Sequence, residues 1–533
     1  MDKTGSPTSR VFSFDVFDTC ITRCCDRPVD LFERLFTDLL AQQKISRYER
    51  KALAKSLARS RIAAETTARQ QTTNDDVTLV AIYQVLEHTL APYDISPTAA
   101  ATAEIELELA AVSPILSTQQ RIQQLRSQGS KIVFISDMYL PGDVVRQMLI
   151  DQGFSDGSDA LYVSADVGLS KGSGRLFPHV CDQLGIATKQ LHHTGDTRYA
   201  DVRAARRQGV KATHFTDGNP NRYEQGFRAE LIGDGWVRSH LIGLSRAVRL
   251  RHATDDSQNQ THAALAANVL APLITGYLLW VLTVAQQLEI EHLYFSDKGL
   301  LAIAQAIIQS IHQQWPKQHE PYLPPDLPTC QLINEAKQTA KQTSDEAPGF
   351  MLCPAIKQAQ IVSPQTDQLS SCLSYVESDI KPRKQLAGTA YLFERRAGIE
   401  TLISVLSTSR PSIYQAIVAD YIDSLLRWQH LSYSGSHTSE QTNSQPSLEP
   451  AYLAALKRYA INNAILLIAK PTPSEVQALL NLENNLDHNL DADNTSPWID
   501  TWPEGANALS PFPVQTSRLA LRQLRRIIKK IAS

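Results

Sequence analysis

Short apolar segments that end in polar side chains are the feature that most restricts how this chain can fold. Val11–Phe14 is followed by Asp15 and Asp18, and Lys131–Ile135 is followed by Ser136. Further strand-like segments cover residues 161–164, 190–194 and 210–215. Helical patterns separate these segments, and strands that alternate with helices predict a doubly wound parallel sheet, an α/β fold.

The polar groups that follow the strands are expected to converge, because the carboxyl ends of parallel strands share one edge of the sheet. Besides Asp15 and Ser136 they include Lys171, Asp196 and Asp201. Convergent carboxylates suit a hard cation such as Mg²⁺, and a lysine beside a serine suits phosphoryl oxygens. Asp15 could then attack phosphorus as a covalent nucleophile. Ser136 or Asp201 taken singly is more simply a turn residue, whereas Asp15 and Asp196 would repel each other without a cation.

A long helical segment separates the first two strands. Its expected helices cover residues 29–43, 46–69, 75–90 and 96–112. A segment of this length can form a small domain of its own. Its second helix carries an excess of Arg and Lys, which could attract an anionic substrate. A solvated helix face, with Arg61 and Glu65 paired at positions i and i+4, explains the same pattern.

The order of these motifs resembles the haloacid-dehalogenase (HAD) superfamily of hydrolases, which has an Asp nucleophile, a Ser or Thr, a Lys and a Gly-Asp pair after successive strands. By position, the resemblance implies Asp15 as the nucleophile and an Mg²⁺ ligand. It implies that Ser136 binds the transferring phosphoryl group and that Lys171 neutralises its charge and orients Asp15. Asp196 would complete the metal site, and Asp201 would join it indirectly or through water.

The resemblance covers roughly residues 9–220 and implies a Rossmann-like core of the HAD type. The helical segment resembles the family's cap, which closes over the active site and excludes water. The implied activity is that of a Mg²⁺-dependent, phosphatase-like hydrolase with an aspartyl-phosphate intermediate and a small phosphorylated substrate.

Position 17 departs from the family's pattern. Phosphatases of the family usually carry a second Asp two positions after the nucleophile, as the general acid, and here that residue is Phe17. The backbone carbonyl of Phe17 could still bind the metal, as the equivalent carbonyl does in the family. Asp18 is adjacent, but on an extended chain its side chain would point to the other side. Since general acid catalysis typically contributes about 10²- to 10⁴-fold, its loss should restrict the enzyme to good leaving groups or leave it slow.

Three short motifs resemble a narrower bacterial group of predicted HAD-type hydrolases associated with surface-polysaccharide glycosyltransferases. They are Ser13–Thr19, Ile135–Pro141 and Gly168–Lys171. That group commonly shares the Phe at position 17, and it implies a role in polysaccharide biosynthesis with a glycosyltransferase as partner. Two alternatives stay open: a catalytically weak binding or scaffold protein of polysaccharide assembly, and a dehalogenase-like hydrolase of the same family.

A chain of 533 residues is expected to contain more than one domain. We expect a catalytic core at residues 9–24 and 119–250 and a helical cap at residues 25–118. A second α/β or mainly helical domain is expected at residues 255–514, and a basic amphipathic terminal helix at residues 515–533. The terminal helix suits a membrane surface or a partner protein, and an ordinary terminal helix explains it equally.

The second half begins with Ala263–Ala285, which is apolar and about long enough to cross a bilayer. It contains Asn268, Pro272 and Gly276 and lacks flanking Lys/Arg clusters, so we expect a buried helix instead. A strand at 293–295 and helices at 300–312, 397–407, 411–428 and 450–468 are expected to follow.

Composition narrows the functional classes further. The formal net charge of -3 gives no indication of a nucleic-acid partner. The seven cysteines form no CxxC pair and have no zinc-ligand spacing, as expected for reduced thiols. The first residues are polar and lack the apolar core of a signal peptide, so we expect a cytoplasmic protein.

Overall fold

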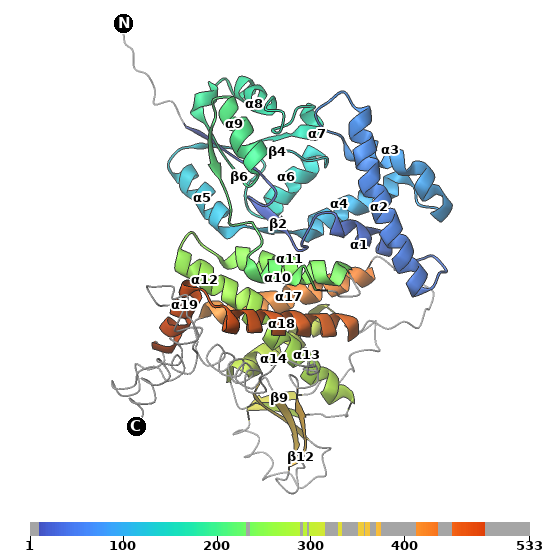
Figure 1. The fold of residues 1–533 in the computed structure, drawn as a ribbon, viewed down its shortest axis with the longest axis vertical. Helices are drawn as coiled ribbons and strands as arrows, with labels where there is room; N and C mark the ends of the chain where they lie inside the picture. Colours follow the sequence, from blue (N-terminus) through green and yellow to red (C-terminus); the bar gives the residue numbers. More distant parts are fainter. Residues whose placement is uncertain are drawn as a thin grey trace, which may run out of the picture.

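The computed structural model describes most of the chain. The described residues are 10–230, 235–287, 292–295, 298–314, 329–332, 350–355, 358–362, 369–374, 412–434 and 450–484. Figure 1 shows two units, one built around a sheet and drawn in blue to green, the other largely helical. We call residues 10–215 the first unit and residues 222–484 the second unit. The helix predicted at 397–407 and the basic helix at 515–533 lie outside the described residues.

A five-stranded parallel sheet is the centre of the first unit, which confirms the predicted Rossmann-like arrangement. The strand order is β5-β4-β1-β6-β7. The strands are β1 (Val11–Phe14), β4 (Lys131–Ser136), β5 (Ala160–Val163), β6 (Leu191–Gly195) and β7 (Lys211–His214). The central strand β1 pairs with β4 and β6, so that Phe14 lies opposite both Phe134 and Thr194.

Helices cover both faces of this sheet because its strands are apolar on both sides. Alternate residues of β4 enter two different cores, Phe134 on the side of α5 (Leu116–Ser127) and α6 (Gly142–Asp151) and Ile135 on the other. The second face is covered by α8 (Leu176–Leu184) and α9 (Ala205–Arg207), and the short α7 (Ser164–Val167) follows β5.

The predicted helical insertion forms a cap of four helices. They are α1 (Asp30–Leu39), α2 (Arg47–Gln71), α3 (Leu79–Leu90) and α4 (Pro97–Ala111). Two short antiparallel strands, β2 (Ile21–Arg23) and β3 (Val112–Pro114), connect the cap to the core. Helix α3 begins later than predicted, because Thr78 caps it and the residues before Thr78 bond to the core instead.

Arg61 shows that the basic helix of the cap is more than a solvated face. The side chain of Arg61 is completely buried, and it donates two hydrogen bonds to Glu104 and one to Glu65. The pairing of Arg61 with Glu65 is confirmed, while the pairing with Glu104 had no signal in the helix pattern. Arg47 and Arg59 of the same helix are exposed, as predicted.

The second unit is mostly helical and contains a second sheet. Its helices include α10 (Arg222–Phe227), α11 (Gly235–His252), α12 (Ser257–Leu265), α13 (Ala271–Gln287), α14 (Lys298–Gln314), α17 (Ser412–Ser434), α18 (Pro450–Ala469) and α19 (Pro473–Asn484). The sheet has the order β12-β11-β10-β8-β9 and comprises β8 (His292–Phe295), β9 (Thr329–Leu332), β10 (Phe350–Ala355), β11 (Gln358–Val362) and β12 (Leu369–Ser374). Only β8 among these strands was predicted.

The apolar segment that opens the second half is a core helix, as expected. By length and composition Ser257–Leu282 could cross a membrane, but 94% of its most apolar window is buried inside the protein. Its side chains share one hydrophobic cluster with Tyr421 and Tyr459. Tyr223 and Phe227 of α10 belong to the same cluster. The proposed division at residue 250 stays a prediction.

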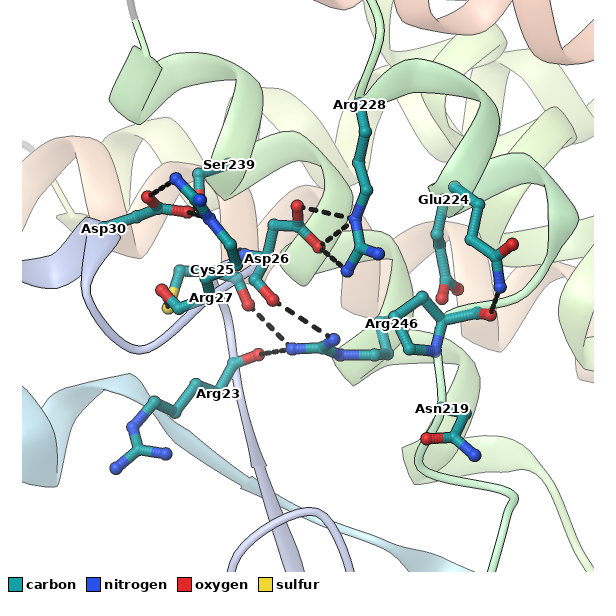
Figure 2. A network of polar contacts seen from close by, with 12 residues as sticks. Arg23, Cys25, Asp26, Arg27, Asp30, Asn219, Glu224, Arg228, Ser239 and Arg246 are labelled. Carbon is teal, nitrogen blue, oxygen red and sulfur yellow. Dashed lines mark hydrogen bonds and ion pairs between the residues drawn. The ribbon is translucent and has the colours of Figure 1, made fainter. Parts of the chain in front are cut away.

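Helix α11 faces the first unit and holds the segment that enters the cap (Figure 1). Arg246 of α11 donates to the carbonyl of Cys25 at 2.7 Å, and Ser239 accepts the Asp26 N–H at 2.9 Å. Arg228 forms an ion pair with Asp26 at 2.6 Å (Figure 2). We call residues 23–30 the cap-entry segment; polar contacts from the second unit fix its backbone.

Gly243 of α11 allows this contact to be close. A Cβ atom at position 243 would lie 2.1 Å from the backbone nitrogen of Cys25 and 2.3 Å from the carbonyl carbon of Cys24. Only glycine fits there without a shift of the backbone. Trp428 of α17 shares a small apolar cluster with the same cysteines, so the two units contribute to one apolar core.

Candidate active site

Four of the predicted site residues come together at the carboxyl edge of the first sheet. Asp15 follows β1, Asp196 follows β6, Asp201 lies in the helical turn Arg198–Ala204, and Lys171 lies in the loop before α8. The backbone N–H of Asp15 donates to Thr194 and so continues the pairing of β1 with β6 by one residue.

Lys171 links two of the carboxylates. Its Nζ lies 2.5 Å from Asp15 Oδ1 and 2.6 Å from Asp201 Oδ1, and its side chain is almost completely buried. Burial acts to lower the pKa of Lys171, but the charges of Asp15 and Asp201 outweigh it and hold the pKa above its usual range. Lys171 is therefore a protonated ammonium bonded to the carboxylate of Asp15.

The three carboxylates form a group in which ligand atoms of Asp15, Asp196 and Asp201 all lie within 4.8 Å of one another. Burial raises the pKa of Asp15, and the charges of Asp201 and Asp196 raise it further, against the effect of Lys171. Burial and the charge of Asp18 raise the pKa of Asp196. A divalent cation would relieve this repulsion, so the donor set fits a hard metal ion such as Mg²⁺.

Asp201 has both carboxylate oxygens in use. Its Oδ1 accepts from Lys171 and from His193 Nε2 at 3.1 Å, and its Oδ2 accepts the Thr197 N–H at 2.8 Å. Burial acts to raise the pKa of Asp201, but Lys171 and His193 outweigh it and hold the pKa below its usual value. These contacts favour an indirect place for Asp201 in the metal site, acting through Lys171.

His193 was missed from the sequence. It lies in β6 and contacts Asp201. Burial lowers the pKa of His193, so its ring is neutral at pH 7. Since Asp201 can only accept, Nε2 carries the proton, and Nδ1 accepts from Ser13 Oγ at 2.9 Å. One indication of this position was present in the sequence: side chains alternate along a strand, so His193 lies on the same side of β6 as Gly195.

Asp137 was also missed, although it directly follows Ser136. Its carboxylate accepts the backbone N–H of Lys171 at 2.7 Å and of Gly172 at 3.1 Å. Burial raises the pKa of Asp137, against the effect of Lys171. Asp137 therefore fixes the loop that presents Lys171 to Asp15.

Asp18 does not lie as predicted. Its φ of 53° is left-handed, so the chain turns sharply instead of continuing extended. The N–H of Asp18 donates to the Ile21 carbonyl at 2.6 Å, and its Oδ1 accepts from Thr22 at 2.9 Å. The turn leaves Asp18 near enough to Asp196 to raise the pKa of that carboxyl.

The Ser136 hydroxyl and the Phe17 carbonyl have no hydrogen-bond partner among the described residues. Ser136 Oγ is completely enclosed and has no hydrogen-bond partner, and the same holds for Thr19 Oγ1 in the loop after Asp15. Among the described residues, none donates to the Phe17 carbonyl. A buried hydroxyl without a partner is costly, so an oxyanion at this edge of the sheet would satisfy it.

The cap touches the loop that carries Lys171. Asp75, in the connection between α2 and α3, donates its N–H to the Gly168 carbonyl and accepts the Ser170 N–H at 3.1 Å. Asp76 accepts from Ser164 Oγ at 2.5 Å. Cap and core therefore meet at the loop that carries Lys171.

Solved structures with partial similarity to the chain are HAD-type hydrolases. A 2-haloacid dehalogenase from Pseudomonas syringae pv. Tomato DC3000 is 15% identical, with a TM-score of 0.30 over 40% of this chain and 89% of that one. A HAD phosphatase from Thermococcus onnurineus is 18% identical, with a TM-score of 0.28 over 40% and 88%. The putative HAD-hydrolase YfnB from Bacillus subtilis, bound to magnesium, is 16% identical, with a TM-score of 0.29 over 39% and 89%.

No family model matches the chain, and no curated protein matches it. Similarity as low as that to the solved structures does not determine an activity. The chemistry of this site rests on its own residues and their geometry.

Proposed function

We propose that this protein is a Mg²⁺-dependent hydrolase of the HAD type that cleaves a phosphorylated metabolite through an aspartyl-phosphate on Asp15. The observation that carries the proposal is the position of Lys171, bonded to both Asp15 and Asp201 at the edge where Asp196 also lies. This arrangement supports Asp15 as a carboxylate nucleophile beside a fixed positive charge and a candidate cation site.

Asp15 performs the chemical step in this proposal. Its carboxylate attacks phosphorus, the bond from phosphorus to the leaving oxygen breaks, and an acyl phosphate forms on Asp15. Water then attacks the phosphorus of that acyl phosphate, which releases inorganic phosphate and restores the carboxylate. Lys171 holds Asp15 in place and balances charge on the phosphoryl oxygens.

Asp15, Asp196 and the Phe17 carbonyl would hold the metal ion, with Asp201 acting through Lys171 or water. When bound, Mg²⁺ would neutralise negative charge on the carboxylates and on the phosphoryl group. Ser136 Oγ, enclosed and without a partner, supports a hydrogen bond from this hydroxyl to the phosphoryl group.

Phe17 determines which kinds of leaving group we expect the enzyme to release quickly. Its ring cannot give a proton to the departing oxygen, so that oxygen must leave as an anion or take its proton from water. We expect good leaving groups to react much faster than simple alkoxides, by about the 10²- to 10⁴-fold that a general acid contributes.

The biological setting that we propose rests on the motif resemblance alone. Ser13–Thr19 with its Phe17, Ile135–Pro141 and Gly168–Lys171 support a cytoplasmic enzyme of surface-polysaccharide biosynthesis with a glycosyltransferase partner. The basic segment 515–533, which lies outside the described residues, is the proposed contact with a membrane or that partner.

The decisive experiment compares the wild type with Asp15→Asn on p-nitrophenyl phosphate and on alkyl phosphates, with Mg²⁺ and with EDTA. We expect Mg²⁺-dependent release of phosphate by the wild type alone, fastest on the nitrophenyl ester. Asp182→Asn, which changes an exposed carboxylate on α8, is the matched control and should behave as the wild type. Absence of activity above Asp15→Asn on every phosphate ester would refute the proposal and favour a binding protein, whereas chloride release from 2-haloacids would favour a dehalogenase.

A further inference from the structure

Arg23 lies beside the residue that replaces the general acid. It is the last residue of β2, and its guanidinium carbon lies 4.1 Å from the centre of the Phe17 ring. Phe17 is two residues beyond Asp15, so the contact places Arg23 next to the loop of the nucleophile. On its other side Arg23 reaches Glu108 of α4, so it lies where cap and core meet.

The hydrogen bonds of Arg23 are incomplete. A guanidinium has five N–H donors. Arg23 uses its Nε to bond Glu108 Oε2 at 2.7 Å, and no described residue accepts from its two terminal amino groups. The side chain is 5% exposed, and neither terminal nitrogen is among the fully enclosed atoms that lack a partner. In Figure 2 the guanidinium of Arg23 points away from the network around Arg246.

Arg61 provides the contrast within the same cap. It is completely buried, and each of its three nitrogens donates to a carboxylate of Glu104 or Glu65. Arg61 is thus satisfied by the protein, as a structural arginine should be. In Arg23 the planar edge with the two terminal amino groups has no partner among the described residues. Such an edge can donate two parallel hydrogen bonds to a carboxylate or phosphate.

The second unit helps to keep Arg23 in place. Strand β2 pairs with β3, and Arg246 of α11 holds the Cys25 carbonyl at 2.7 Å, with a longer contact of 3.5 Å to the carbonyl of Arg23. Glu108 fixes the guanidinium at its Nε. A donor held in this way loses little freedom when it binds an anion.

We propose that Arg23 binds a second anionic group of the substrate, a carboxylate or a phosphate in the leaving portion of a phosphate ester. This inference rests on the proposed function and narrows its substrate class to esters whose leaving group carries its own negative charge. Arg23 is then a specificity-determining residue, with its unused N–H groups meeting the anion while the apolar Phe17 ring supports the guanidinium from one face.

The test uses substrates that differ in one group: phosphoglycolate, ethyl phosphate and ethylene glycol bisphosphate. Phosphoglycolate and ethylene glycol bisphosphate carry a second anionic group and are called the doubly anionic esters. For at least one of them we expect the wild-type kcat/KM to exceed that for ethyl phosphate by about 10- to 100-fold, the range for hydrogen bonds to charged groups. Arg23→Gln should lose this preference chiefly through KM, and Arg23→Lys should keep part of it. A preference for phosphoglycolate or for the bisphosphate identifies the anion as carboxylate or phosphate.

Arg27→Gln is the matched control, because Arg27 lies in the same segment with its side chain 60% exposed. It should keep the full preference. Since the preference is a ratio measured on one protein sample, partial loss of folded protein does not change it. If Arg23→Gln does not fold, Arg23→Lys decides. A preference that survives both substitutions would overturn the inference.

Binding to the Asp15→Asn protein separates this inference from the proposed function. Calorimetry should show tighter binding of at least one doubly anionic ester than of ethyl phosphate, and the difference should vanish when Arg23→Gln is added. If no ester is hydrolysed but this difference is found, the proposed function fails and the anion site stands. Hydrolysis without any preference, or equal or undetectable binding of all three compounds, overturns the role of Arg23.

Discussion

Replacing Asp196 tests whether the acidic group is built around a cation. With Lys171 positive and Asp15, Asp196 and Asp201 ionised, these four residues carry a net charge of −2. Two unit charges at the 4.8 Å limit of this group repel by about 3.5 kcal/mol at an effective dielectric constant of about 20. Partial exposure of Asp196 and its attraction to Lys171 reduce this value, so we expect Asp196→Asn to stabilise the metal-free protein by about 1–2 kcal/mol.

The stabilisation should grow with pH. The pKa values of Asp15 and Asp196 are raised by burial and by neighbouring carboxylates, so in the folded protein these groups ionise later than in the unfolded chain. Wild-type stability therefore falls as pH rises from the unfolded pKa values through the folded ones, and Asp196→Asn removes part of that loss.

Thermal unfolding with and without Mg²⁺ provides the measurement. Without metal, the midpoint for Asp196→Asn should lie about 2–8 °C above that of the wild type, for a unit of 150–250 residues. Added Mg²⁺ should raise the wild-type midpoint and leave the variant nearly unchanged. Asp182→Asn should follow the wild type in both conditions. A variant that is less stable than the wild type without metal, or that gains as much from Mg²⁺, would refute a cation site at Asp196.

Two further substitutions test the junction between the units. Gly243→Ala should destabilise the protein by about 1–3 kcal/mol, because the new methyl group would overlap the backbone of Cys24–Cys25. Gly226→Ala in α10 is the control, since a methyl group has room there and should cause no loss of stability. Equal thermal midpoints for the two variants would contradict the close contact at Gly243. His240 is buried among aromatic rings, and burial lowers its pKa from 6.5 to about 3, so wild-type stability should fall as pH falls from about 6.5 toward 3. His240→Phe should lose less stability over that range, and parallel pH profiles of the two proteins would contradict a neutral His240.

The sequence predicted the convergent part of the site because that part follows from topology. Once four strands are parallel in one sheet, the residues after them share an edge, whatever their separation in the chain. Asp15, Lys171, Asp196 and Asp201 come together in this way. The role of Lys171 as a partner that orients Asp15 came from the resemblance to the HAD superfamily, not from residue type alone.

The supporting residues could not be predicted, because their roles depend on register and on local turns. His193 meets Ser13 only because β1 and β6 pair with these two residues in register. Asp137 reaches the N–H groups of the Lys171 loop through a contact across 34 residues of sequence. Asp18 was misplaced because a left-handed residue that is not glycine is rare, and no neighbouring residue announces it.

The second unit was predicted unevenly for a similar reason. The helices α17 and α18 lie close to the predicted ranges 411–428 and 450–468, whereas α10, α11 and α19 were not predicted. The strands β9–β12 have 4 to 6 residues each, and β10, β11 and β12 pair antiparallel without a sustained alternation of apolar and polar residues in their sequences. The hold of α11 on the cap-entry segment joins residues more than 200 positions apart, and neither partner has a local pattern that indicates it.

The cap has two attachments, one to the second unit and one to the loop of Lys171, and their contacts differ in kind. At the cap-entry segment, Arg246 is buried, Gly243 packs directly on backbone, and Asp26 is paired and largely buried. At the loop of Lys171 the ion pair of Asp75 with Arg175 has a mostly exposed arginine, and exposed pairs contribute little to stability. On the same side, however, Asp76 accepts from the buried Ser164 Oγ at 2.5 Å, so both attachments include buried contacts. Arg23 belongs to the cap-entry segment and bonds Glu108 of α4, so its position beside Phe17 depends on the attachment that the second unit fixes.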